Sequence, residues 1–126
     1  MSNSILIVDD YIINRLILKE IIEETGLQVL EASNGKEALD QLQAHKIDLV
    51  LMDIEMPVMN GFDATKAIKN HQNKTIKQVK VIGITAHDVN NNSLEINDFS
   101  IFDGFISKPF TLDYVLECVK LNLEMK

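Results

Sequence analysis

The sequence predicts an α/β fold in which helices cover both faces of a doubly wound, five-stranded parallel sheet. Five short apolar runs alternate with longer segments of helical character. Four of these runs are rich in Val, Ile or Leu instead of alternating strictly, as expected for strands covered on both faces. Right-handed crossovers between parallel strands place helices on both sides of such a sheet. The 126 residues suffice for one domain with a single core.

Each predicted strand is a short run in which apolar side chains dominate. In chain order the runs are ILIV at 5–8, QVLEA at 28–32, IDLVLM at 47–52, VKVIGIT at 79–85 and GFIS at 104–107. In parallel sheets of this kind, ligands bind at the carboxyl ends of the strands. The residues that follow each run are therefore the first candidates for function.

The predicted helices begin or end at identifiable residues. Residues 11–25 contain no Gly or Pro, and this helix stops at Gly26. Two further helices begin at Gly35 and Gly61. Thr111 can cap the last helix. That helix carries an apolar stripe at helical spacing, formed by Leu112, Val115, Leu116, Val119 and Leu123.

The segment 88–102 has the weakest helical signal. It contains four asparagines, whose side-chain amides compete for backbone hydrogen bonds and disfavour helix interiors. We expect a short or frayed helix there, with high mobility.

Composition and charge exclude several classes of function. A net charge of −7 disfavours direct nucleic-acid binding, which needs Lys and Arg, but it is compatible with a bound cation. Cys118 is the only cysteine, so no intramolecular disulfide can form, and we interpret it as a packing residue. No apolar run approaches the length of a membrane span, and the residues before Ile5 are too few for a signal peptide. We expect a cytoplasmic protein with no membrane contact.

Polar residues gather at the predicted strand ends. Asp9 and Asp10 follow the first strand, Asp53 follows the third, Thr85 ends the fourth and Lys108 follows the fifth. Three close carboxylates repel one another and raise one another's pKa values, a conflict that a divalent cation removes. Carboxylate oxygens and water are the ligands that Mg²⁺ prefers. The sequence therefore predicts a magnesium site around these carboxylates.

Such a site can accept a phosphoryl group. Aspartate is a covalent nucleophile in some phosphoryl transfers, and the reaction mainly requires that the phosphoryl oxygens be neutralised and aligned. Mg²⁺ and Lys108 can supply positive charge, and Thr85 can donate a hydrogen bond. Asp53 is then the candidate acceptor.

Four motifs together resemble the receiver domain of two-component response regulators over essentially the whole chain. They are VDD at 8–10, LMDIEMPVMNGFDA at 51–64, GITAH at 83–87 and FISKPF at 105–110. The resemblance is strongest to receivers that partner hybrid sensor kinases. It implies a flavodoxin-like fold with strand order 2-1-3-4-5, and a single receiver domain over residues 1–126 with no output domain visible.

The resemblance also implies roles for single residues. Asp53 matches the phosphoacceptor, and Lys108 matches the lysine that binds the phosphoryl group. Asp9, Asp10 and Asp53, with the backbone carbonyl of Glu55, match the Mg²⁺ ligands.

Further positions match the switch that follows phosphorylation. Thr85 matches the switch hydroxyl, and Phe105 matches the aromatic residue that turns inward. Glu55 and His87 lie two positions beyond the acceptor and the switch hydroxyl, so both are expected to tune the site. The bond between Lys108 and Pro109 matches one that is usually cis in the family.

The implied function is that of a signalling switch and not of an enzyme. A histidine kinase or a histidine phosphotransfer protein would phosphorylate Asp53 with Mg²⁺ bound. The surface formed by the segment 88–102, the strand 104–107 and the last helix would then change for a downstream protein target. Family members commonly have Ala-Gly where this chain has Ser100 and Ile101, so the turn before the last strand must be built differently.

Other functions fit the sequence less well. A haloacid-dehalogenase-type phosphatase, with Mg²⁺ and an aspartyl nucleophile, would need a second Asp where Glu55 stands, and no cap domain fits in this length. A phosphorylation-independent pseudo-receiver would be expected to lack Asp10, Asp53 or Lys108. A dinucleotide-binding domain is disfavoured because no G-x-G-x-x-G follows the first strand. A stand-alone regulator and a receiver cut from a longer protein both remain open.

Overall fold

Five parallel strands form one sheet in the order β2-β1-β3-β4-β5, in a computed structural model that describes residues 3–56, 60–85, 99–108 and 110–123. The strands are β1 (Ser4–Val8), β2 (Gln28–Ala32), β3 (Leu49–Asp53), β4 (Lys80–Thr85) and β5 (Gly104–Ser107). All four neighbouring pairs are parallel. The predicted fold class and strand order are confirmed.

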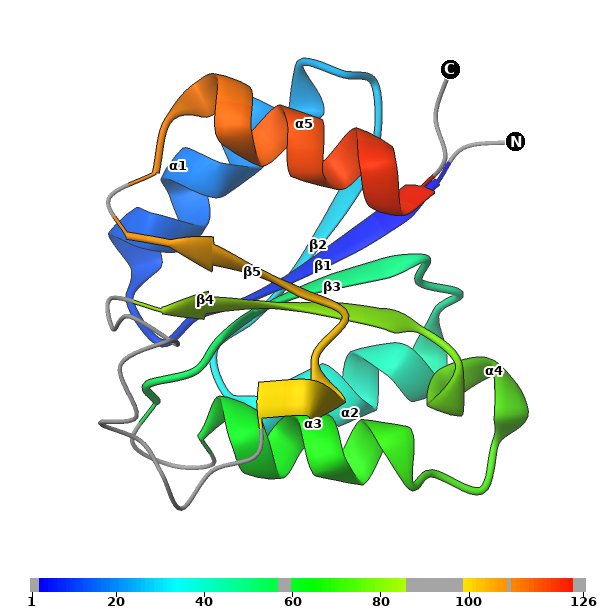
Figure 1. Ribbon diagram of the computed structural model, residues 1–126. Coiled ribbons are helices and arrows are strands. Elements are labelled where there is room, and N and C mark those ends of the chain that lie inside the picture. Colours follow the sequence, from blue (N-terminus) through cyan, green and yellow to red (C-terminus); the bar gives the residue numbers. More distant parts are fainter. Residues whose placement is uncertain (1–2, 57–59, 86–98, 109, 124–126) are drawn as a thin grey trace.

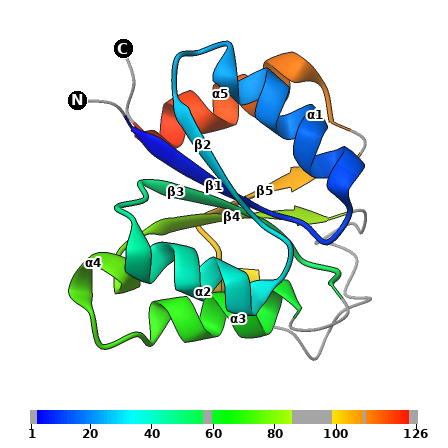
Figure 2. The ribbon, with the colours of Figure 1, turned by 180° about the vertical axis from the view of Figure 1, so that it is seen from behind.

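Helices cover both faces of the sheet (Figures 1 and 2). Helices α1 (Ile12–Glu23) and α5 (Leu112–Leu123) lie on one face, and α2 (Gly35–Ala44) and α3 (Gly61–Lys69) lie on the other. Successive strand residues point to opposite faces, so each strand contributes to two cores. Ile5 and Ile7 of β1 pack toward α1 and α5, whereas Leu6 and Val8 pack toward α2 and α3.

Polar side chains mark where three of the helices begin. The Asn34 side chain accepts the N–H of Glu37 at the start of α2, and the Asn60 side chain accepts the N–H of Asp63 at the start of α3. The predicted cap of α5 is present, because Thr111 Oγ1 accepts the N–H of Tyr114 at 3.1 Å. After α1 ends, Gly26 adopts a φ of 85°, a left-handed conformation that glycine tolerates best.

Two short elements complete the described chain. The helix α4 (Lys74–Lys77) was not predicted, because four residues are too few to show an apolar period. Most of the segment 88–102 lies outside the described residues. Its last three residues form one 3₁₀ turn, η1 (Phe99–Ile101).

Asp103 fixes the turn that leads from η1 into β5. Its carboxylate Oδ2 accepts the N–H of Val81 and an N–H of the Lys69 ammonium, both at 2.8 Å. The Asp103 N–H in turn donates to the Val81 carbonyl. Side-chain contacts to β4 and α3 thus hold a turn in which Ser100 and Ile101 replace the Ala-Gly pair common in the resembling family. Among the described residues, no helix is long and apolar enough to cross a membrane.

Candidate functional site at the carboxyl edge of the sheet

The strand register brings the predicted polar residues to one edge of the sheet. β3 pairs with both β1 and β4, so Asp53 at its end lies between the turn after β1 and the end of β4. One carboxylate oxygen each from Asp9, Asp10 and Asp53 lies within 4.8 Å of the other two. Asp9 and Asp53 are buried, with 1% and 3% of their surface exposed, and Asp10 is exposed.

The Asp53 carboxylate lies in a mixed electrostatic environment. Its Oδ1 accepts the N–H of Glu55 at 3.2 Å and lies 3.6 Å from the Lys108 ammonium. Burial, followed by the charge of Asp9, raises the pKa of Asp53 to about 7, although Lys108 and the Glu55 N–H act to lower it. Without a cation, this group therefore carries a fractional charge near neutral pH.

Asp9 presents a carboxylate oxygen that the described protein atoms leave unsatisfied. Its Oδ1 accepts the N–H of Tyr11 at 2.9 Å, while Oδ2 is buried and has no hydrogen-bond donor among the described residues. A buried oxygen of this kind is costly unless a cation or water satisfies it. The three carboxylates therefore fit a hard divalent cation such as Mg²⁺.

Thr85 and Glu55 contact each other directly. Thr85 is fully buried at the end of β4, and its Oγ1 donates a hydrogen bond to Glu55 Oε1 at 2.9 Å. Both residues were predicted to act at the site, as switch hydroxyl and as tuning residue, but their mutual bond was not predicted. The hydroxyl expected to meet a phosphoryl group is thus already held by a carboxylate.

Phe105 packs in a row of aromatic rings beneath this edge. It is partly buried, and its ring centroid lies 5.3 Å from that of Phe102, which in turn meets Phe62 edge to face at 5.4 Å. Gly83 provides the room, because a Cβ there would lie 3.1 Å from carbons of both Phe102 and Phe105. The ring predicted to switch therefore lies against a strand position that has no side chain.

Gly61 allows α3 to approach the chain just after Asp53. A Cβ at this position would lie 2.6 Å from the Asp53 carbonyl oxygen and from the Ile54 Cα. The Gly61 N–H donates to the Ile54 carbonyl at 2.9 Å. This contact explains why a glycine follows the acceptor strand at the start of α3.

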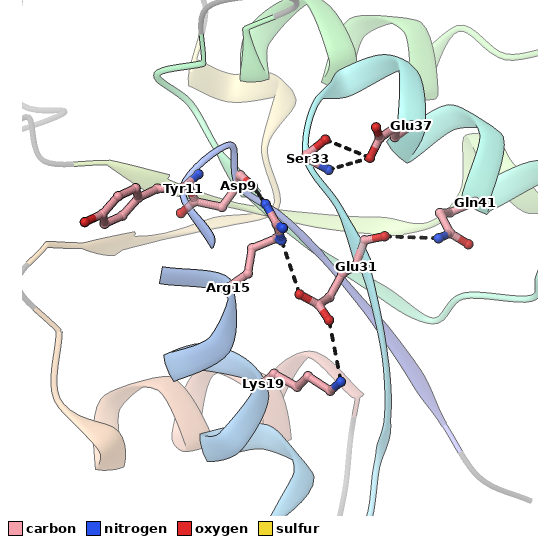
Figure 3. A network of polar contacts seen from close by, with 8 residues as sticks. All are labelled: Asp9, Tyr11, Arg15, Lys19, Glu31, Ser33, Glu37 and Gln41. Atoms are coloured by element: carbon pink, nitrogen blue, oxygen red, sulfur yellow. Dashed lines mark hydrogen bonds and ion pairs between the residues drawn. The ribbon is translucent and has the colours of Figure 1, made fainter. Parts of the chain in front are cut away.

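Two predicted residues and one predicted contact site were missed or lie out of reach. His87 and Pro109 lie outside the described residues, so the tuning role of the first and the cis bond before the second stay predictions. Sequence reasoning missed Arg15, whose guanidinium donates to the backbone carbonyl of Asp9 (Figure 3). The sequence offered only one hint, a basic residue six positions after an acidic one that ends a strand.

Comparisons with known proteins agree with this geometry. The family model described as "Response regulator receiver domain" matches residues 5–120. The polar-differentiation response regulator DivK of Brucella anthropi is 32% identical over 123 residues, covering 98% of each chain. The autoinducer 1 sensor kinase/phosphatase LuxN of Vibrio campbellii is 35% identical over 112 residues, which are 89% of this chain but 12% of LuxN.

A solved structure gives the same result. The response regulator TrrA of Thermotoga maritima, in complex with Mg²⁺ and BeF, superposes with a TM-score of 0.81. It is 34% identical in sequence, and the match covers 96% of this chain and 99% of TrrA.

Proposed function

Because this chain belongs to the response regulator receiver family of two-component signalling, we propose that Asp53 accepts a phosphoryl group with Mg²⁺ bound beside it. The donor is the phosphohistidine of a sensor histidine kinase or of a histidine phosphotransfer protein. Asp9, Asp10, Asp53 and the backbone carbonyl of Glu55 hold the ion. One observation carries the proposal: three carboxylates converge around a buried aspartate, and one buried Asp9 oxygen has no donor among the described residues.

The chemistry follows from the positions of the charged groups. A carboxylate oxygen of Asp53 attacks phosphorus, the bond between phosphorus and the donor's imidazole nitrogen breaks, and that nitrogen keeps the electron pair. Bound Mg²⁺ supplies positive charge to the phosphoryl oxygens and favours the ionised, nucleophilic form of Asp53. The Lys108 ammonium, 3.6 Å from Asp53 Oδ1, supplies the second positive charge.

The output depends on Thr85 exchanging partners. In the resting state its hydroxyl donates to Glu55, and after phosphorylation it donates to a phosphoryl oxygen. The ring of Phe105, which lies against Gly83 one strand over, then turns inward. These movements alter the surface around β5, α5 and the segment 88–102. Such a switch needs a bias of only a few kcal/mol between two states.

The exposed face of α1 supports docking of a protein donor next to the acceptor. Directly after Asp9 and Asp10, five large apolar side chains are about half exposed: Tyr11, Ile12, Ile13, Leu16 and Ile17. A hollow of about 450 Å³ lies along part of this face. Contiguous exposed apolar side chains mark protein interaction sites, and this one adjoins the carboxylates that the donor histidine must reach.

The same proposal covers the setting in which the domain works. It is a signalling domain and not a classical enzyme, it acts in the cytoplasm, and its target is a downstream protein and not nucleic acid or a membrane. The phosphatase alternative is weaker because the Glu55 carboxylate, which stands at the position of the general acid, is engaged by Thr85. The pseudo-receiver alternative is weaker because Asp10, Asp53 and Lys108 are all present at one edge.

Phosphorylation of two variants tests the proposal. Wild-type protein is incubated with Mg²⁺ and phosphoramidate, a small donor with a phosphorus–nitrogen bond, and analysed by intact-mass spectrometry. We expect one added phosphoryl group on the wild type and none on Asp53→Asn or in the presence of EDTA. Asp48→Asn, which changes a carboxylate before β3, is the matched control and retains labelling. Equal labelling of Asp53→Asn and wild type would falsify the assignment.

A further inference from the structure

Arg15 joins the first acidic residue of the site to the neighbouring strand. Its Nη1 donates to the carbonyl oxygen of Asp9 at 2.6 Å, and its Nε donates to Glu31 Oε1 at 3.2 Å (Figure 3). The side chain is 15% exposed. One guanidinium on α1 therefore contacts both the turn after β1 and the strand β2.

Glu31 is itself held in place from two sides. Its Oε2 lies 3.5 Å from the Lys19 ammonium, and its carbonyl oxygen accepts a hydrogen bond from Gln41 Nε2 at 3.0 Å. A lysine on α1 and a glutamine on α2 thus fix the residue that fixes Arg15. The guanidinium cannot rotate freely, because its partner is anchored on a strand.

The backbone of Asp9 is consequently held at both of its polar groups. Its N–H donates to the Ala32 carbonyl of β2 at 3.1 Å, and its C=O accepts from Arg15. These bonds leave the side chain of Asp9 to point toward Asp10 and Asp53, with which it shares the 4.8 Å cluster. The peptide that links Asp9 to Asp10 is the one whose oxygen Arg15 binds.

We propose that Arg15, anchored by Glu31, is a positioning residue that orients the Asp9–Asp10 peptide so that both carboxylates face the cation. This inference rests on the proposed function, because it concerns the same metal site. Arg15 touches neither the ion nor the reacting atoms. The planar fork of a guanidinium can bind a carbonyl and a carboxylate at once in fixed geometry, which a lysine ammonium does less well. Groups that orient metal ligands typically change metal affinity 10- to 100-fold when removed.

The alternative is that the pair of Arg15 and Glu31 only stabilises the fold. Partly exposed ion pairs contribute little to stability, so thermal unfolding alone would not separate the two roles. Affinity for Mg²⁺ does separate them, because a merely structural pair would leave it unchanged in folded protein.

Titration with Mg²⁺ alone, followed by isothermal calorimetry, is the test. We expect Arg15→Met to weaken Mg²⁺ binding about tenfold and Arg15→Lys to recover part of that loss. Lys19→Met is the matched control, because it removes a positive charge from the same network without touching Asp9, and it stays within about twofold of wild type. Glu31→Gln releases Arg15 without changing α1, and its effect combined with Arg15→Met is less than additive.

Each result bears on one of the two proposals. Wild-type affinity in folded Arg15→Met, or in Glu31→Gln should Arg15→Met not fold, overturns the positioning role while Asp10→Asn still abolishes binding. Equal weakening in Arg15→Met and Lys19→Met also overturns it, because net charge would then account for the loss. Wild-type protein that binds Mg²⁺ no better than Asp10→Asn overturns the metal site of the proposed function itself.

Discussion

At the amino edge of the sheet, Asp48 Oδ2 accepts the N–H of Ser4 at 2.8 Å, and Ser4 Oγ bonds the Gln28 side chain at 3.1 Å. At the carboxyl edge, Asp9 Oδ2 is buried without a donor among the described residues, and Asp53 has a raised pKa. Both edges carry acidic side chains just outside the strands. Those at the amino edge complete the fold, whereas those at the carboxyl edge are brought together at a cost in stability. An unsatisfied buried carboxylate thus distinguishes a functional edge from a structural one.

The stability of the protein without Mg²⁺ should record this cost as a function of pH. The pKa of Asp53 is about 7 in the folded state against 3.8 for an ordinary aspartate. The folded state therefore holds a proton that the unfolded state has lost, and stability falls as pH rises from about 4 to about 7. The predicted loss is at most about 4 kcal/mol, and urea unfolding at several pH values measures it.

Asp53→Asn is the reference for that measurement, because it should lack this part of the pH dependence and be more stable than wild type at pH 8. The comparison is needed because Glu37, whose pKa is lowered by hydrogen bonds from Ser33, contributes with the opposite sign. Addition of Mg²⁺ should narrow the difference. Parallel pH profiles of wild type and Asp53→Asn would contradict the cost assigned to the carboxyl edge.

Exchanging one carboxylate at each edge should separate the edges by Mg²⁺ affinity. Asp10→Asn removes a proposed ligand and is expected to weaken Mg²⁺ binding by about a hundredfold or more, beyond the effect of an outer-shell change. Asp48→Asn keeps an oxygen that can accept the Ser4 N–H and should leave binding unchanged. Calorimetric titration checks both, and equal losses in the two variants would remove the distinction between the edges.

Gly61 should be the position where a single methyl group disturbs the carboxyl edge most. In Gly61→Ala the new Cβ would meet backbone atoms 2.6 Å away, and we expect a loss of about 2 kcal/mol in unfolding free energy. Gly104→Ala is the control, because its Cβ would meet only the end of the Ile82 side chain at 3.0 Å. Denaturant unfolding with similar losses for both would show that the approach of α3 to Asp53 is not special.

The bond between Thr85 and Glu55 should have the smallest but most specific effect. Glu55→Ala frees the Thr85 hydroxyl and removes a negative charge, so binding of beryllium fluoride with Mg²⁺ should tighten about fivefold, equivalent to about 1 kcal/mol. Glu55→Gln keeps an oxygen acceptor and should lie between wild type and Glu55→Ala. Weaker binding by Glu55→Ala would mean that Glu55 assists the phosphorylated state instead of opposing it.

The sequence was most informative where position along a strand determines position in space. Asp9, Asp53 and Thr85 were placed correctly because the ends of parallel strands must meet at one edge. Arg15 was missed because its contact depends on how α1 is rotated against β2, which no sequence period reveals. The helix α4 was missed because one helical turn shows no periodicity, and the bond between Thr85 and Glu55 depends on side-chain rotamers.

The ion pairs around Glu31 have a second consequence, because β2 is an outermost strand of the sheet. Outermost strands can recruit a strand from another molecule and so begin aggregation, and charged side chains discourage this. Glu31, with Lys19 and Arg15 beside it, places such charges on β2. The opposite border is β5, which is only four residues long and offers little length for pairing.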